Sequence, residues 1–138
     1  GEETGWRGFA LPRMQARLSP LLASLIISLL WINWHLFLWK AEGNPFFSWE
    51  YWIIQYALHI TTALIIGWIY NRSKGSILVA GIAHAAANTG NAVFSNMDPL
   101  ILILVLAVAA LVLILTDRMW QKLPPDHPAV YHEPAPAG

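Results

Sequence analysis

Four polar side chains that could do chemistry stand in otherwise apolar surroundings: Glu2, His35, His84 and Asn88. They occupy three separate stretches of the chain. His84 and Asn88 are four residues apart, as are Trp31 and His35, so each pair shares one face of a helix. Ionisable groups at membrane depth are costly and typically face a bundle interior or a water-filled cavity. A carboxylate and imidazoles gathered there can exchange protons or bind zinc.

A purely structural interpretation competes with this one. A lone intramembrane His or Asn is often a hydrogen bond that joins two helices. Gln55 and His59 also lie four residues apart, and by spacing alone they look equally good. Glu2 and Glu3 could merely lie at an interface near the start of the chain. The presence of an acid, imidazoles and an amide on three separate helices favours a site.

The elements that carry these residues are predicted to be membrane-spanning helices. Of the 138 residues, 57% are hydrophobic and 12% are charged, about half the ~25% charged residues of a soluble domain. Four stretches contain no Asp, Glu, Lys or Arg, and each is close to the ~20 residues that cross a bilayer. These are residues 20–39, 51–70, 76–97 and 100–116. We expect an all-α, polytopic transmembrane bundle whose uniformly aliphatic fourth span faces lipid.

The basic residues predict an orientation for four spans. One side of the membrane would hold six of them and the other only Lys40, and cytoplasmic loops carry the excess of Lys and Arg. The six are Arg13, Arg17, Arg72, Lys74, Arg118 and Lys122. The C-terminus is therefore expected on the cytoplasmic side of an integral membrane protein, in a prokaryotic plasma membrane.

The first residues are predicted to be helical, with Pro12 closing the helix. Glu3 and Arg7 then lie four residues apart on one face and form an ion pair. Glu2 is rotated by about 100° from Glu3 and faces another neighbour. Because no Met or signal-like segment precedes this stretch, we expect it to be the end of a longer helix.

The other end of the chain differs in composition. Residues 124–138 are rich in Pro and polar residues and lack an apolar period, which predicts a mobile tail after a transmembrane core of residues 1–123. His127 and His132 in this tail are interpreted as having no functional role.

Three sequence segments together resemble one known family. EETGWRGFALPR resembles the EExxxR motif of the CPBP intramembrane proteases, also called the CAAX prenyl protease or Abi family. WINWH is similar to the second motif of that family, an aromatic residue four before a His. GSILVAGIAHAAANTG resembles the third motif, HxxxN. Order and spacing agree over residues 2–91, which indicates the catalytic core of such a protease.

The resemblance implies an intramembrane endopeptidase whose catalytic groups line a cavity in a helical bundle. By position, Glu2 would activate a water molecule with help from His35. His84 and Asn88 would hold the developing oxyanion.

The resemblance also implies supporting residues. Glu3 and Arg7 would brace the first helix, and Trp31 stands where the family commonly has Phe. His59 matches no motif, so its expected role is packing.

Two alternatives stay open at this point. One Glu and two His, here Glu2, His35 and His84, could hold a catalytic zinc with water as the fourth ligand. We favour a metal-free site, because Asn88 beside His84 suits an oxyanion donor. The expected partners are a peptide or lipidated-protein substrate and the lipid bilayer. A membrane peptide-binding or bacteriocin-immunity protein could use the same cavity without cutting.

Other mechanisms and partners lack their residues. The sequence has no HExxH zinc motif and no Cys that could act as a nucleophile. Eight basic residues are balanced by eight acidic ones without a dense basic cluster, so we expect no nucleic-acid partner.

Overall fold

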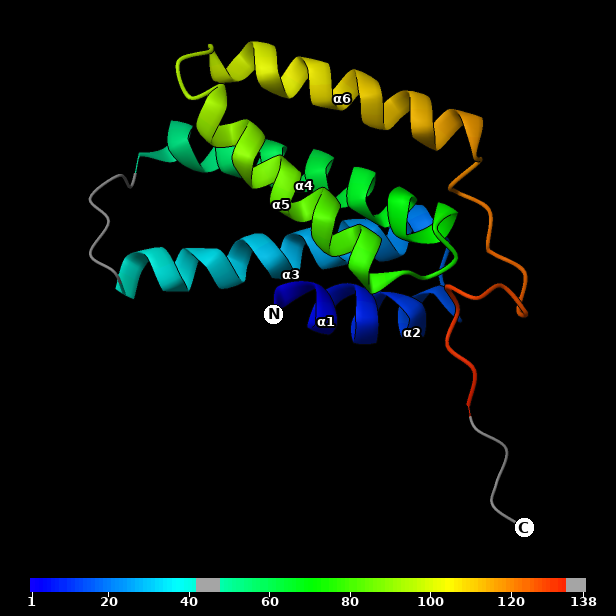
Figure 1. The fold of residues 1–138 in the computed structure, drawn as a ribbon. Helices are drawn as coiled ribbons and strands as arrows, with labels where there is room; N and C mark the ends of the chain where they lie inside the picture. Colours follow the sequence, from blue (N-terminus) through cyan, green and yellow to red (C-terminus); the bar gives the residue numbers. More distant parts are fainter. Residues whose placement is uncertain (42–47, 134–138) are drawn as a thin grey trace.

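The computed structural model describes residues 1–41 and 48–133, and in these ranges the chain is helical without strands (Figure 1). The first helical run comprises α1 (Glu2–Gly5), the π-helical η1 (Trp6–Ala10) and α2 (Leu11–Gln15). Four longer helices follow: α3 (Pro20–Ala41), α4 (Trp49–Arg72), α5 (Ile77–Val93) and α6 (Pro99–Thr116). The predicted all-α fold is confirmed.

Three of these helices, α3, α4 and α6, are long and apolar enough to cross a membrane. The fourth expected span, residues 76–97, forms the shorter α5, which has 17 residues. The helix ends early because Phe94 caps it and the chain then turns into α6, where Asp98 and Pro99 provide the N-cap and the first helical residue. The protein is therefore an integral membrane protein built as a helical bundle.

Short polar side chains fix where three helices begin. The Ser48 and Ser76 hydroxyls accept hydrogen bonds from backbone N–H groups in the first turns of α4 and α5. The Asp98 side chain accepts from Leu100 N–H at the start of α6. These bonds satisfy donors that have no partner inside the helix.

Two helices end in the same backbone motif. After α4, Gly75 N–H donates to Tyr70 O at 2.9 Å, and after α6, Met119 N–H donates to Ile114 O at 3.0 Å. Both bonds require a left-handed residue just before the donor, and Lys74 (φ 57°) and Arg118 (φ 48°) adopt that conformation. Two non-glycine residues thus hold a conformation that usually favours glycine.

Pro12 does not close the first helix, which corrects the sequence prediction. The helical run continues to Gln15, and Pro12 lies in the first turn of α2 directly after the π-helical turn η1. A π-turn shifts the hydrogen-bond register, which lets the run continue through a residue without an N–H. The Arg13 side chain donates to Phe9 O at 3.0 Å, giving that carbonyl a partner.

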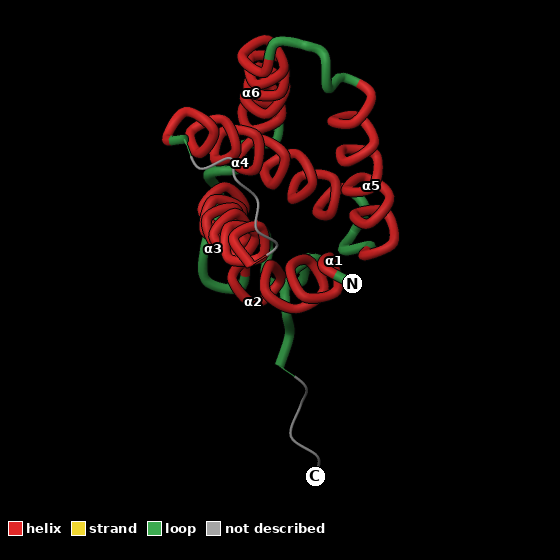
Figure 2. The backbone as a smooth tube through the Cα atoms, turned by 90° about the vertical axis from the view of Figure 1, so that its left-hand side faces the viewer, coloured by secondary structure: helices red, strands yellow, loops and turns green. Residues whose placement is uncertain are grey.

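The bundle packs around α4, which contacts α3, α5 and α6 (Figure 2). Gly67 of α4 leaves no room for a Cβ beside Ser24 of α3, so these helices approach closely. The N-terminal run lies against α3 and α5, and Gly8 meets Ile77 there. Helix α6 has its main contacts with α4, and Ala110 is its buried residue. Most of its apolar surface can therefore face lipid.

The first part of the segment after α6 contacts the bundle. Ala129 and Val130 are buried, Gln15 Nε2 donates to Ala129 O at 2.9 Å, and Tyr131 N–H donates to Pro12 O at 3.1 Å. Composition could not reveal these partners, because they lie more than 100 residues earlier. Residues 134–138 of the expected tail lie outside the described part of the chain.

Candidate active site

Glu3 joins the first helical run to α5. Its Oε1 atom lies 2.8 Å from Arg7 Nη1 and 2.8 Å from His84 Nδ1. The ion pair predicted from the spacing of Glu3 and Arg7 is confirmed. Both side chains are buried, so the pair is shielded from solvent. The contact with His84 was not predicted from the sequence. A carboxylate only accepts hydrogen bonds, so His84 carries its proton on Nδ1.

Glu2 faces a different neighbour, as its rotation from Glu3 predicts. Its Oε2 atom accepts a 2.7 Å hydrogen bond from the indole Nε1–H of Trp31 on α3. A phenylalanine at this position could not make that bond. Trp31 is only 3% exposed, so the bond is sheltered from water and fixes the direction of the carboxylate.

The Trp31 ring lies at the centre of three imidazoles. Its centroid is 5.6 Å from the His35 ring, 4.9 Å from the His59 ring and 5.0 Å from the His84 ring, each in an edge-on arrangement. Arg7 lies over the same ring at 5.4 Å. Trp31 therefore packs between the three imidazole rings, and its edge contacts help to orient them.

His35 and His59 are oriented by their own helices. His35 Nδ1 lies 3.1 Å from Trp31 O, and His59 Nδ1 lies 2.8 Å from Gln55 O. A carbonyl oxygen can only accept, so Nδ1 is the protonated nitrogen in both rings. In the neutral rings Nε2 is then the acceptor. It can take a proton or accept a hydrogen bond from a water molecule.

One cavity brings the four predicted catalytic residues together. It has a volume of about 170 Å³ and is lined by Glu2, His35, His84 and Asn88. His59 also lines it, although it matches no motif, and so does Gln55. The signal that could have found His59 was its four-residue spacing from Gln55, which equals the spacing in the two histidine motifs.

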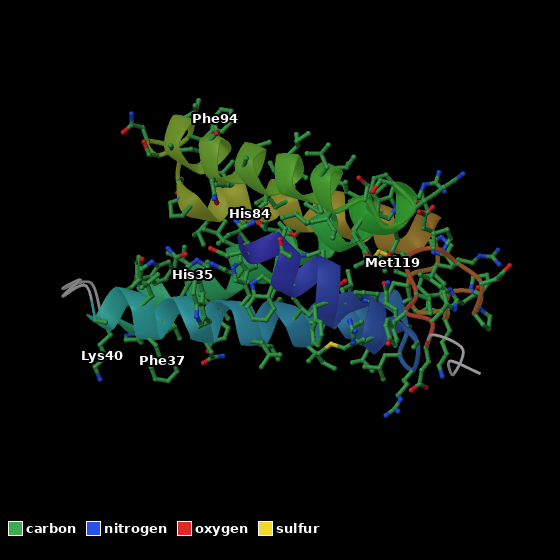
Figure 3. All side chains as sticks on the ribbon, turned by 60° about the horizontal axis from the view of Figure 1, so that its bottom comes forward. His35, Phe37, Lys40, His84, Phe94 and Met119 are labelled. Carbon is green, nitrogen blue, oxygen red and sulfur yellow. The ribbon has the colours of Figure 1, made fainter. Side chains whose placement is uncertain are left out.

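Figure 3 shows His35 and His84 on different helices at the side where the N-terminal run crosses, whereas Phe37 of α3 points away from the bundle. Phe37 is 76% exposed, two residues from His35 on the same helix. Helix α3 thus turns His35 inward and Phe37 outward at this level.

A wider groove lies beside the cavity. It has a volume of about 510 Å³ and runs between the first residues of the chain and α5. Glu2, His84 and Asn88 line both hollows. Ile77, Leu78 and Ile82 add apolar side chains to the groove. An extended apolar ligand in the groove would therefore lie next to the polar cavity.

The possible zinc ligands are arranged for other contacts in this structure. Within residues 1–41 and 48–133, no three His, Asp or Glu side chains form a cluster with the geometry to hold a metal ion. Glu2 bonds to Trp31, and His84 bonds to Glu3.

Comparison with known proteins bears on this arrangement. The family described as Type II CAAX prenyl endopeptidase Rce1-like matches residues 1–90, about two thirds of the chain. This match contains all three motifs and every residue named in the cavity. The chain belongs to this family.

One curated relative of this CAAX prenyl endopeptidase family also matches. CAAX prenyl protease 2 of Methanococcus maripaludis is 29% identical over 131 residues, which covers 88% of this chain and 48% of the relative. The chain thus spans about half the length of this relative. No solved structure matches the chain. The predicted resemblance to this protease family is confirmed. We therefore interpret the site in terms of peptide hydrolysis.

Proposed function

We propose that this protein hydrolyses a peptide bond of a lipidated substrate by a metal-free mechanism in which Glu2 activates water. The observation that carries the proposal is the single cavity lined by Glu2, His35, His84 and Asn88, in a member of the CAAX prenyl endopeptidase family. The orientation with a cytoplasmic C-terminus is part of the proposal. It is supported by the segments 13–17, 72–74 and 118–122, which contain the six basic residues and lie near one end of the bundle (Figure 1).

The first step is proton transfer from water. The Glu2 carboxylate, held by Trp31, takes one proton, and the hydroxide oxygen adds to the scissile carbonyl carbon. His35 Nε2 accepts the O–H that the water retains, which directs its lone pair towards the carbonyl. General-base catalysis of this kind contributes roughly 10²–10⁴-fold to a rate.

The second requirement is a pair of donors for the oxyanion. His84 gives its Nδ1–H to Glu3, so it can also donate from Nε2 only as the imidazolium. The Glu3 carboxylate lies 2.8 Å from Nδ1 of this ring. The Asn88 amide supplies the second donor from the next turn of α5. When the tetrahedral intermediate collapses, the C–N bond breaks and Glu2 returns its proton to the leaving amine.

The groove between the N-terminal residues and α5 suits the substrate class. Its apolar side chains can take a prenyl chain or an apolar peptide segment, while its polar end is shared with the cavity. A lipidated peptide would thus bind with its apolar part in the groove and its scissile bond at Glu2.

The test uses a farnesylated peptide that ends in C-a-a-X, incubated with membranes from cells that express the protein. We expect mass spectrometry to detect a shortened peptide with the parent and none with Glu2→Gln, which keeps the size of the side chain. Peptide binding should survive this substitution. Equal cleavage by both proteins would refute Glu2 as the base, and binding without cleavage by the parent would indicate a peptide-binding protein.

Metal dependence is tested in the same assay. We expect cleavage to continue after treatment with a strong zinc chelator, because the proposed mechanism contains no metal step. Loss of cleavage that added zinc restores would instead assign Glu2, His35 and His84 as metal ligands.

A further inference from the structure

His59 brings a third imidazole to the cavity, from a helix that carries none of the three motifs. Glu2 comes from α1, His35 from α3 and His84 from α5, whereas His59 belongs to α4. Its ring centroid is 5.2 Å from that of His35. All four helices around the cavity therefore contribute a titratable side chain to it.

The orientation of His59 leaves one nitrogen for the cavity. Nδ1–H donates to Gln55 O of the preceding turn, so Nε2 is the acceptor of the neutral ring. The same arrangement holds for His35 with Trp31 O. Both rings line the same space of about 170 Å³, which is large enough for water.

A packing role accounts poorly for this arrangement. An imidazole that joins two helices would bond to a polar group on a neighbouring helix, but the hydrogen bond of His59 is to its own helix. Its ring meets Trp31 edge-on and His35 at a tilt, contacts that a phenylalanine could reproduce. Neither of these ring contacts uses the Nε2 nitrogen.

This inference rests on the proposed function. We propose that His59 is a further catalytic group and that His59 and His35 both bind the attacking water. The water gives one proton to Glu2, and its remaining O–H is shared between Nε2 of His35 and Nε2 of His59 in a three-centre hydrogen bond. When the oxygen attacks the carbonyl carbon and forms the C–O bond, it keeps this hydrogen. Neither imidazole is therefore protonated in the step. Glu2, His35 and His84 are the titratable groups that face His59 from the other helices.

The experiment compares two substitutions that keep different parts of the side chain, using the farnesylated C-a-a-X peptide. His59→Phe keeps a ring and removes both nitrogens, and we expect kcat to fall by about 10-fold or more while KM changes less than about twofold. His59→Gln keeps an acceptor and should recover part of kcat. His132→Phe, the same substitution in the exposed C-terminal segment, is the matched control and should behave as the parent.

A double-mutant cycle with His35→Phe tests whether both rings act on one water. We expect the losses in kcat to be strongly non-additive, since removing the second ring matters less once the first is gone. Unchanged kcat in His59→Phe, or a change in KM and thermal stability alone, would overturn the inference while Glu2-dependent cleavage still stands. Absence of Glu2-dependent cleavage would instead refute the proposed function and this inference with it.

Discussion

His84 Nδ1 and Glu3 Oε1 lie 2.8 Å apart, and the same oxygen is 2.8 Å from Arg7 Nη1. Glu3 therefore serves two partners, one within its own helical run and one on α5. The second acid of the EExxxR motif connects the first motif directly to the third. It decides which nitrogen of His84 carries the proton.

Glu3→Gln should impair catalysis more than substrate binding. The amide removes the negative charge next to His84 Nδ1, and we expect kcat to fall by about 10-fold to 100-fold with little change in KM. Steady-state cleavage of the farnesylated peptide measures this. Glu50→Gln, on an exposed side chain in the first turn of α4, is the control. Full kcat in Glu3→Gln would show that His84 does not need the carboxylate.

Trp31→Phe should separate the indole hydrogen bond from the ring. The phenyl ring can keep edge contacts with the imidazoles, but the 2.7 Å bond to Glu2 is lost. Hydrogen bonds to charged groups contribute about 1.5–3 kcal/mol, so we expect roughly a 10-fold or greater loss in kcat. Trp120→Phe, at an exposed position after α6, should have no effect. Equal activity of Trp31→Phe and the parent would contradict a positioning role for the indole.

Gly67→Ala should weaken the packing of α4 on α3. An added Cβ would overlap Ser24 Oγ, and overpacking of this kind costs about 1–3 kcal/mol. Ser24→Ala removes that oxygen, which is buried without a hydrogen-bond partner among the described residues, and should restore stability to the double mutant. Thermal unfolding in detergent measures each variant. Gly90→Ala, where a Cβ meets open space, is the control. A double mutant no more stable than Gly67→Ala would place the strain elsewhere.

Neighbouring substitutions after α4 should have opposite effects. Gly75 has φ +82° and a Cβ there would lie 2.9 Å from Pro128 O, so Gly75→Ala should lower the free energy of unfolding and release the C-terminal segment. Lys74→Gly should raise the free energy of unfolding by about 1 kcal/mol, because it relieves a left-handed non-glycine residue. Thermal unfolding and the rate of tryptic cleavage after Lys122 measure these changes. Changes of the same sign at both positions would contradict this account.

The sequence alone predicted the helices well, because length and apolar composition decide them. The bounds of α3, α4 and α6 lie within two residues of the expected spans. Helix α5 is shorter than expected, since its end depends on the turn that leads to Asp98 rather than on composition. Pro12 misled the prediction because a π-turn, which no composition rule reveals, precedes it.

For the candidate site, the sequence predicted the contacts within one helix but not those between helices. Helical spacing places Arg7 beside Glu3 and turns Glu2 away, and the structure bears out both relationships. Spacing within one helix says nothing about contacts between helices. The bonds from Trp31 to Glu2 and from His84 to Glu3, and the entry of His59 into the cavity, depend on how α1, α3, α4 and α5 pack.

The central claim is that Glu2 is the base of a peptide hydrolysis. The most direct test compares peptide termini in membranes from cells that express the protein with those from cells that express Glu2→Gln at the same level. We predict termini that appear only when Glu2 is intact, and their sequences would identify the substrates. Identical termini in both membranes would contradict the claim, and the cavity would then need a bound peptide in place of a scissile bond.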